Sequence, residues 1–241
     1  MATKEQVEQH RRKRKRLMLY EKEKGGVGST GTLATFAHSL MHRGIPVIFI
    51  EASLSQRDIE HAYGGRHRVE PIDLGDESDQ EKLITIIDDA PDGAYILVNV
   101  PGGRFEDLDR VHEFLRFAIE DDEDPLDIDV DIVWTMGLDQ ASRATLDAML
   151  AGDPPGRVLL NLPAWHGPPQ KFVLVDAELL EAVAKTGGDV FCCPALPEHI
   201  YDKFRTDNMG LDQIDAGLSR GTRARFRMWQ RDVEDALGGL F

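Results

Sequence analysis

A glycine-rich turn between a short apolar segment and an amphipathic helix restricts the fold of this chain more than any other feature. Residues 17–20 are apolar, residues 25–28 read Gly-Gly-Val-Gly, and apolar side chains then recur at three- and four-residue spacings over residues 33–41. Gly44 ends this predicted helix, and the apolar residues 47–50 have the continuous pattern of a strand buried on both faces of a parallel sheet. Together the segments predict a strand–turn–helix–strand unit.

The rest of the chain continues this alternation. Further strands are predicted at residues 95–100, 132–136, 158–162 and 190–193, helices at residues 82–88, 108–119, 143–150 and 177–185, and a loop with a short helix at residues 54–79. The alternation indicates an α/β fold, a doubly wound and mostly parallel sheet with helices on both faces. We expect three parts: a basic arm (residues 1–16), an α/β domain (residues 17–210) and a helical tail packed on it (residues 211–241), broken near Gly221.

Charge is unevenly distributed along the 241 residues. The whole chain has a formal net charge of -15, but residues 1–16 hold seven Lys or Arg residues against two glutamates. An acidic body is not a general nucleic-acid binder, whereas the arm, and residues 11–16 above all, could contact DNA, an anionic membrane or an acidic partner. The plainer interpretation is a solvated, disordered leader.

The sequence also indicates a compartment. No segment approaches the roughly 20 apolar residues of a transmembrane helix, and the N-terminus lacks the apolar core of a secretory signal. The only two cysteines, Cys192 and Cys193, are adjacent, so no disulfide framework is expected. These features predict a cytoplasmic protein.

The glycine-rich turn has the composition of a phosphate-binding loop. Glycines let backbone N–H groups point inward, and the following helix N-terminus adds a favourable dipole. Conventional loops also carry a lysine for the β- and γ-phosphates, followed by a Ser or Thr whose hydroxyl holds Mg²⁺. Thr30 fits the hydroxyl role, but Ser29 occupies the lysine position. The alternative is a purely structural turn formed by Gly25, Gly26 and Gly28.

This loop resembles a known family motif. Lys24-Gly25-Gly26-Val27-Gly28-Ser29-Thr30 is similar to the deviant Walker A motif of the ParA/MinD family of P-loop ATPases. The resemblance implies that Lys24 is the signature lysine, which reaches across a nucleotide-dependent homodimer to the partner's phosphates. It also implies that the loop binds ATP or ADP, and that Thr30 is a ligand of Mg²⁺. An ordinary exposed lysine is the alternative interpretation of Lys24.

The resemblance continues along most of the chain. Glu51 and Ser53 follow the second strand, where family members carry two acidic residues, and Asn99 occupies the position of the Walker B aspartate. Asn161 resembles the asparagine that recognises adenine, and Pro194 begins a segment that resembles the second base-contacting loop. A strand-end cap at Asn99 and a turn former at Asn161 remain alternatives.

The departures from the family pattern bear on catalysis. Ser29, Ser53 and Asn99 replace a lysine and two aspartates that serve phosphate charge and metal. A contact between unit charges at about 4 Å is on the order of 4 kcal/mol at an effective dielectric of about 20, and phosphoryl transfer depends on such neutralisation. We therefore expect ATP hydrolysis to be weak or absent. Binding should survive, because the backbone amides, Lys24 and Thr30 remain.

The predicted tail carries a basic stripe beside an apolar one. Its arginines are Arg220, Arg223, Arg227 and Arg231, and its apolar residues are Phe226, Trp229 and Val233. This pattern predicts an amphipathic helix with one basic edge, which either pairs with the acidic body or contacts DNA, phosphate or a partner protein.

Within the family, the chain is most similar to plasmid mobilisation and stability proteins of the TraL/MobD/StbB kind, in length, in the asparagine-bearing fifth strand and in the tail. This resemblance implies a nucleotide-binding switch in plasmid partition, stability or conjugative mobilisation. The alternative is a non-hydrolysing pseudo-ATPase scaffold that acts through the basic arm and the arginine-rich helix. A conventional ATP-dependent ligase or synthetase is disfavoured, because it needs the missing lysine and carboxylates.

Overall fold

Parallel strands form the centre of the structure, a computed structural model that describes residues 14–215 and 217–241. The strands are β1 (Lys15–Glu21), β2 (Val47–Glu51), β3 (Val69–Pro71), β4 (Tyr95–Asn99), β5 (Ile128–Thr135), β6 (Arg157–Asn161) and β7 (Asp189–Phe191). They form one sheet in the order β3-β2-β4-β1-β5-β6-β7, and every pairing is parallel. The predicted doubly wound parallel sheet is confirmed.

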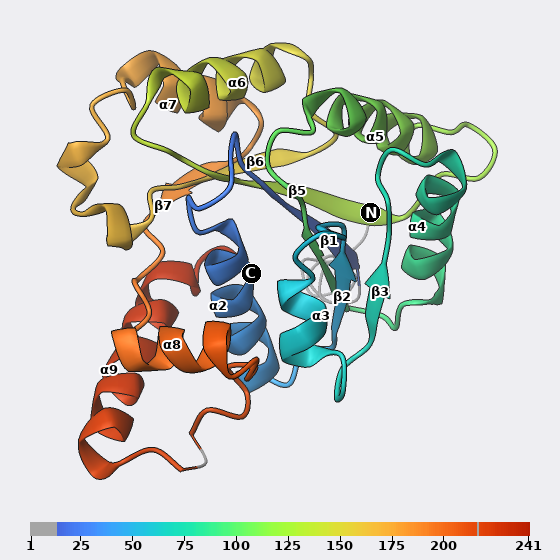
Figure 1. Cartoon of the computed structure of the whole chain (residues 1–241). Coiled ribbons are helices and arrows are strands. Elements are labelled where there is room, and N and C mark those ends of the chain that lie inside the picture. The colour runs from blue at the N-terminus through green and yellow to red at the C-terminus, as the bar shows by residue number, and fades with distance from the viewer. Residues whose placement is uncertain (1–13, 216) are drawn as a thin grey trace, which may run out of the picture.

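Helices cover both faces of this sheet (Figure 1). One face carries α4 (Glu77–Asp89), α5 (Phe105–Ile119), α6 (Gln140–Ala151) and α7 (Ala177–Lys185). The other carries α2 (Ser29–His42), α3 (Asp58–Tyr63), α8 (Glu198–Thr206) and α9 (Arg220–Leu237). Two single turns of 3₁₀ helix, η1 (Ala164–His166) and η2 (Pro169–Lys171), follow β6.

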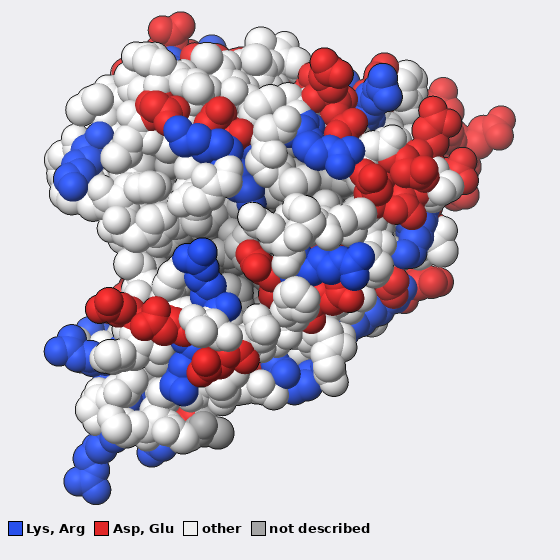
Figure 2. All heavy atoms as spheres, viewed as in Figure 1, with Lys and Arg blue, Asp and Glu red and all other residues white. Residues whose placement is uncertain are grey.

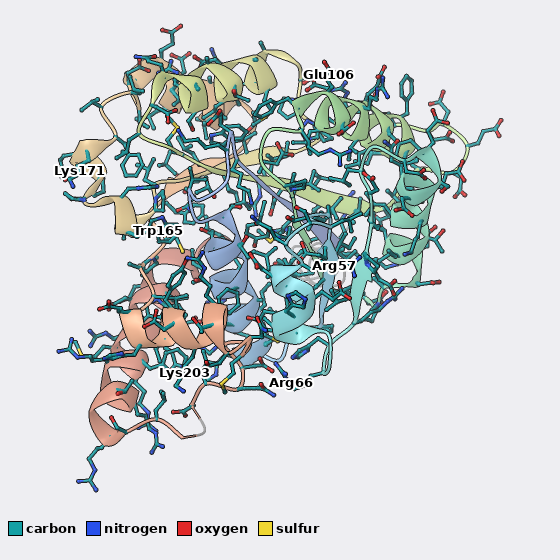
Figure 3. All side chains as sticks on the ribbon, in the orientation of Figure 1. Arg57, Arg66, Glu106, Trp165, Lys171 and Lys203 are labelled. Carbon is teal, nitrogen blue, oxygen red and sulfur yellow. The ribbon has the colours of Figure 1, made fainter. Side chains whose placement is uncertain are left out.

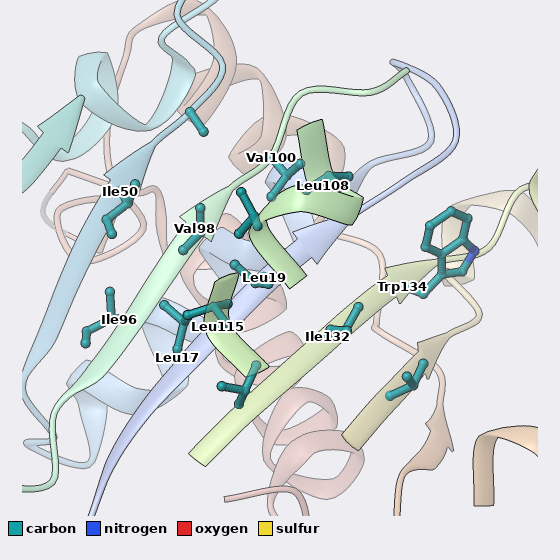
Figure 4. Packing of buried hydrophobic residues seen from close by; sticks show 14 of the residues in the cluster. Leu17, Leu19, Ile50, Ile96, Val98, Val100, Leu108, Leu115, Ile132 and Trp134 are labelled. Carbon is teal, nitrogen blue, oxygen red and sulfur yellow. The ribbon is translucent and has the colours of Figure 1, made fainter. Parts of the chain in front are cut away.

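Strand β1 lies in the middle of the sheet and contributes to both cores. Leu17 pairs in register with Ile96 of β4 and with Val130 of β5. Leu17 and Leu19 point into the cluster under α5, as Figure 4 shows, whereas alternate residues such as Met18 point into the cluster under α2. Because both faces of the strand are covered, its apolar sequence is continuous rather than alternating.

Two elements lie where the sequence predicted none. Strand β3 is three residues long and forms an edge of the sheet, where Pro71 is tolerated because its missing N–H breaks no central ladder. Helix α8 covers the sheet face beside α2. The predicted break near Gly221 is wrong: α9 is continuous, and Gly221 lies in its first turn, where little helix precedes it.

The predicted basic arm overlaps the start of the sheet. Residues 1–13 lie outside the described residues, but β1 already begins at Lys15. Arg16 is 8% exposed, and its guanidinium lies 3.1 Å from a carboxylate oxygen of Asp129 and 3.6 Å from one of Asp131. The expected boundary at residue 16 is therefore wrong, because the last basic residues neutralise acidic side chains of β5.

The C-terminal helix docks on the helix that follows the glycine-rich turn. Helix α9 buries its apolar residues Phe226, Trp229, Val233 and Leu237 in the same cluster as Leu33 and Phe36 of α2. Ser39 of α2 also donates a hydrogen bond of 2.7 Å to Glu234. The tail thus forms the outer layer over α2. No helix in the described ranges is long and apolar enough to cross a membrane.

Candidate functional site

The loop between β1 and α2 lies at the carboxyl edge of the sheet and is closely held from one side. Gly26 and Gly28 have φ angles of 84° and 92°, values that glycine adopts without strain. A Cβ atom on Gly102, in the turn after β4, would lie 2.7 Å from the carbonyl carbon of Lys24. By contrast, a Cβ on Gly25 or Gly26 would meet nothing within 4 Å. The loop is therefore packed on β4's side and open on another.

The backbone amides of this loop have no acceptors within the described chain. The backbone N–H groups of residues 25–31 donate no hydrogen bond to any other described residue. Helix α2 begins at Ser29 without a side-chain cap and without an acidic residue in its first turn. Free N–H groups at a helix N-terminus carry a partial positive charge that favours an anion. The arrangement can therefore bind a phosphate group.

A lysine that the sequence analysis did not single out reaches this loop. Lys22 directly follows β1 and is 7% exposed, and its Nζ donates a 2.6 Å hydrogen bond to the Ser29 hydroxyl. Burial lowers the pKa of Lys22 to about 8, against the opposing charges of Glu51 and Asp58. The available signal was a second lysine two positions before Lys24, at the end of a buried strand.

Thr30 and Asn99 form one hydrogen-bonded chain with Glu51. The Thr30 hydroxyl donates to the Asn99 amide oxygen at 3.2 Å, and the Asn99 Nδ2 donates to Glu51 Oε1 at 2.8 Å. Glu51 also accepts hydrogen bonds from the amides of Ser53 (3.1 Å) and Ile59 (2.8 Å), so it ties β2 to α3. Thus the strand-end amide of Asn99 connects Thr30 with the buried carboxyl group.

Protonation of Glu51 is favoured by its surroundings. Burial raises the pKa of this carboxyl, although the hydrogen bonds from Asn99 and from the backbone of Ile59 and Ser53 oppose the rise. The neutral amide of Asn99 accommodates either state better than a second carboxylate would, because two buried like charges repel. The substitutions at Ser53 and Asn99 therefore leave Glu51 as the acidic group of this network.

Lys24 lies at the surface of the same loop. Its ammonium forms an ion pair with Asp139, the N-cap residue of α6, and both side chains are largely exposed. The hydrogen bond to Asp139 raises the pKa of Lys24, and the same bond lowers the pKa of Asp139. Within one subunit, Lys24 is therefore held by α6 on the outside of the loop.

Trp165 covers part of the loop and was also missed by the sequence analysis. Its indole N–H donates to the Val27 carbonyl at 3.1 Å, and a Cβ on Gly28 would collide with the ring. Figure 3 shows Trp165 on the η1 turn above α8, on the same side of the molecule as Lys171. The signal was an aromatic residue two positions after Pro163, which closely follows β6.

Asn161 and Pro194 have structural contacts. Asn161 is fully buried: its Nδ2 donates to the Thr32 hydroxyl at 2.9 Å, and its Oδ1 accepts from the Cys193 amide at 3.1 Å. The Pro194 carbonyl accepts a 3.4 Å hydrogen bond from the Trp229 indole of α9. The geometry gives Asn161 a role in joining β6, α2 and β7, and a contact with adenine stays a prediction.

Side chains of both charges are interspersed over the face that Figure 2 shows. Figure 2 shows acidic side chains gathered over α4 and α5 and basic side chains extending from the region of α9. On the tail, Arg223 pairs with Asp215 at 3.2 Å and Arg231 with Asp232 at 3.5 Å, so both arginines have partners in the tail itself. Over the described ranges, no group of three or more His, Cys, Asp or Glu side chains is placed to hold a metal ion.

The sequence was compared with family models and with curated proteins. No family model matches the chain. Protein MobD of Acidithiobacillus ferrooxidans is 25% identical over 228 residues, which is 94% of this chain and 98% of MobD.

Solved structures are similar over most of the chain. A structure of the MinC:MinD cell division protein complex of Aquifex aeolicus matches with a TM-score of 0.51 and 16% identity, over 91% of this chain and 96% of the other. A nucleotide-binding protein of Archaeoglobus fulgidus, in complex with ADP, matches with a TM-score of 0.48 and 13% identity, over 88% and 94%. Given the parallel sheet and the glycine-rich loop after β1, the chain has the α/β fold of the ParA/MinD-type P-loop ATPases.

Proposed function

We propose that this chain is a nucleotide-binding switch of the ParA/MinD type with weak or absent ATPase activity. The observation that carries the proposal is the set of unpartnered amides of residues 25–31 at the N-terminus of α2. Buried or half-buried N–H groups without acceptors are costly, and a polyphosphate supplies acceptors for several of them at once. ATP or ADP is therefore the class of ligand that this loop fits.

Magnesium fits the same site through oxygen atoms. The Thr30 hydroxyl oxygen stands at the start of α2, and the Asn99 amide oxygen lies 3.2 Å from it. Both are hard oxygen donors of the kind that Mg²⁺ accepts alongside phosphate oxygens and waters. In the proposed complex, Thr30 holds the ion and supplies no charge, and the phosphates neutralise it.

The same residues support slow or absent hydrolysis. Asn99 and Ser53 are neutral where the related motif is acidic, and the remaining carboxyl, Glu51, has a raised pKa because it is buried. This carboxyl is also committed to hydrogen bonds from Asn99, Ser53 and Ile59, which leaves it poorly placed to orient a cation or to accept a proton from water. Nucleotide binding without rapid turnover is the behaviour that this chemistry favours.

The cellular context of the proposal comes from the resemblance to plasmid mobilisation and stability proteins of the TraL/MobD/StbB kind. The similarity to MobD covers nearly the whole of both chains, which supports a role in plasmid partition, stability or conjugative mobilisation. By analogy with the sandwich arrangement that the loop motif implies, the switch is a nucleotide-dependent homodimer in the cytoplasm. DNA or a partner protein would contact the basic residues of the N-terminal arm or the exposed arginines of α9.

A pseudo-ATPase scaffold is the second candidate function. The observations that favour it are Trp165, which covers Gly28, and Asn161, whose polar atoms are both occupied within the chain. The Trp165 ring must move before a ligand can contact Gly28, and the hydrogen bonds of Asn161 must rearrange before its side chain can contact a nucleotide base. In this case the fold is a scaffold that holds the arm and α9 for contact with a partner, and the glycine-rich loop has only a structural role.

Calorimetric titration with ADP, ATP and a non-hydrolysable ATP analogue, each with Mg²⁺, separates the two functions. We expect saturable binding of all three and phosphate release near background. Gly26→Ala should weaken binding because it strains a loop residue at a φ of 84°. The matched control is Gly187→Ala, at a φ of 77° with equally open space but in the turn before β7. Absence of binding would leave the scaffold, and a turnover matching ordinary family members would contradict the weak ATPase.

A further inference from the structure

Lys22 is a buried cation with too few partners. Its ammonium has three donors, of which one bonds to Ser29 Oγ at 2.6 Å, and no carboxylate oxygen of the described residues lies within 4 Å of it. A buried ammonium is costly unless it is paired and fully hydrogen-bonded. The side chain is 7% exposed, so water satisfies little of the deficit.

The buried charged side chains of β1 are paired. Arg16 lies near Asp129 and Asp131, and His112 lies 2.7 Å from the carboxylate of Glu21. Lys22 therefore departs from the pattern that the same chain follows around the same strand. A position that tolerates an unpaired ammonium is one at which an anionic ligand restores the balance.

The position of Lys22 identifies that anion. Its partner Ser29 opens α2 and occupies the place where the related loop motif has a lysine, beside the unpartnered amides of residues 25–31. We propose that Lys22 replaces the missing loop lysine and that its ammonium binds the terminal phosphates of the nucleotide from the end of β1. The hydrogen bond to the Ser29 hydroxyl positions this ammonium. The inference rests on the proposed nucleotide binding and names the residue that supplies its charge.

Two further features support this replacement. The short Ser29 side chain leaves room for an ammonium at its hydroxyl, whereas a lysine at position 29 would bring a second positive charge to the same place. Burial lowers the pKa of Lys22 to about 8 in the free protein. A phosphate anion beside the ammonium would raise this pKa again, because an opposite charge favours the protonated form. Lys24, in contrast, points to Asp139 on the outside of the loop.

This inference changes an expectation from the sequence. The motif resemblance implies that Lys24 of the partner subunit reaches the phosphates, and Ser29 supplies no charge there. The structure places Lys22 Nζ 2.6 Å from the Ser29 hydroxyl within the subunit, and the proposal brings this second lysine to the phosphates. In the proposed complex, the positive charge of the loop lysine comes from position 22 instead of position 29.

The test compares the full chain with Lys22→Met and with the double variant Lys22→Met/Ser29→Lys. Calorimetry measures the affinity for a non-hydrolysable ATP analogue with Mg²⁺ and for pyrophosphate, and thermal unfolding is followed with and without each. Removal of a charged hydrogen bond to phosphate should weaken binding of both by about tenfold or more. The double variant, which returns an ammonium to the loop, should recover most of that loss.

Thermal unfolding separates a ligand-binding role from a structural one. If Lys22 serves the ligand, Lys22→Met should leave the melting temperature of the free protein unchanged or raise it, and only the shift on adding ligand should shrink. A lower melting temperature with unchanged affinity would mean a structural lysine and overturn the inference.

The controls distinguish the two proposals. Wild type that binds neither probe overturns both proposals. Wild type that binds pyrophosphate in a Lys22-dependent manner but not the nucleotide removes the proposed function and keeps the phosphate role of Lys22. Binding of the nucleotide that Lys22→Met leaves unchanged removes the inference alone.

Discussion

The ammonium of Lys24 and the carboxylate of Asp139 form an ion pair that joins the loop after β1 to the first turn of α6. Asp139 also caps that helix, since its Oδ1 accepts a 3.0 Å hydrogen bond from the Ser142 amide. Exposed ion pairs of this kind are weak and exchange partners readily. In the sandwich dimer that the motif implies, Lys24 must leave Asp139 to reach the partner's phosphates.

The first prediction is that Lys24 decides dimerisation and that Asp139 restrains it. Lys24→Ala should remain monomeric even with saturating nucleotide. Asp139→Asn retains the cap acceptor but loses the ion pair, so it should dimerise at a lower nucleotide concentration than the wild type. Sedimentation of the three proteins with and without an ATP analogue measures both effects. A mass that nucleotide leaves unchanged in the wild type would contradict the switch, and a dimer that persists in Lys24→Ala would remove Lys24 from it.

The second prediction concerns pH and Lys22. Folding lowers the pKa of Lys22 from 10.5 to about 8, because burial disfavours the charged form more than the negative charges of Glu51 and Asp58 favour it. The charged form therefore destabilises the free protein below about pH 8, and the penalty of roughly 3 kcal/mol disappears as the pH rises towards 10. The stability advantage of Lys22→Met over the wild type should shrink over this range in urea unfolding. Near pH 9, nucleotide binding should take up a proton in the wild type only, which calorimetry in buffers of different ionisation enthalpy detects.

Third, Asn99→Asp should destabilise the protein instead of restoring an ATPase. The new carboxyl group would lie where Nδ2 now donates to Glu51 at 2.8 Å, and both groups are buried. Loss of that donor should cost about 1–3 kcal/mol, and the cost should grow as the pH rises and the second carboxyl group ionises. Chemical unfolding over a series of pH values tests it. Asn99→Ser, which adds no charge, is the control and should show no such pH dependence.

A fourth prediction separates the basic arm from the strand. Deletion of residues 1–13 should leave the melting temperature close to that of the wild type, since these residues have no apolar periodicity. Deletion of residues 1–16 should lower the stability by about 2 kcal/mol or more, because it removes the start of β1 and leaves Asp131 with Arg157 alone. If the arm binds DNA or anionic lipid, the shorter deletion should abolish salt-sensitive co-sedimentation. Equal stability of the two deletions would contradict the boundary seen in the structure.

Fifth, Trp165 should report nucleotide binding. Its ring lies against Gly28 and its N–H bonds to the Val27 carbonyl, so a ligand in the loop must change its surroundings. Tryptophan emission should shift on addition of ADP and Mg²⁺, and Trp165→Phe should abolish the shift while it weakens binding by less than about tenfold. Trp134→Phe, a substitution at a tryptophan buried in the hydrophobic core, is the comparison variant and should keep the signal.

The sequence allowed the sheet and most of its helices to be predicted, because periodicity reports burial directly. Strands covered on both faces, such as β1, β4 and β6, read as short continuous apolar segments. The helix α7 matches its predicted range at both ends. Edge strand β3 was not predicted, since a strand of two half-buried residues and the exposed Pro71 carries no burial pattern. Helix α8 buries only Ile200 and Phe204, too few to mark a period.

The candidate site was predictable only where a local motif carries the chemistry. The glycines and Thr30 stand in a contiguous sequence, so their place at the start of α2 followed from it. Lys22 reaches Ser29 only because the loop folds back on itself, and Trp165 meets Gly28 across more than a hundred residues of chain. Such contacts are set by tertiary packing, which a linear pattern does not contain.

The placement of β1 between β4 and β5 has a consequence for how the protein is made. On a ribosome β1 emerges early, yet its neighbours in the sheet come only with residues 95–99 and 128–135, and α2 stays uncovered until α9 has been synthesised. Long-range pairing of this kind is slow, and its apolar strands are exposed meanwhile. The nascent chain should therefore depend on chaperones until late in translation, and the loop should acquire its ligand only after release.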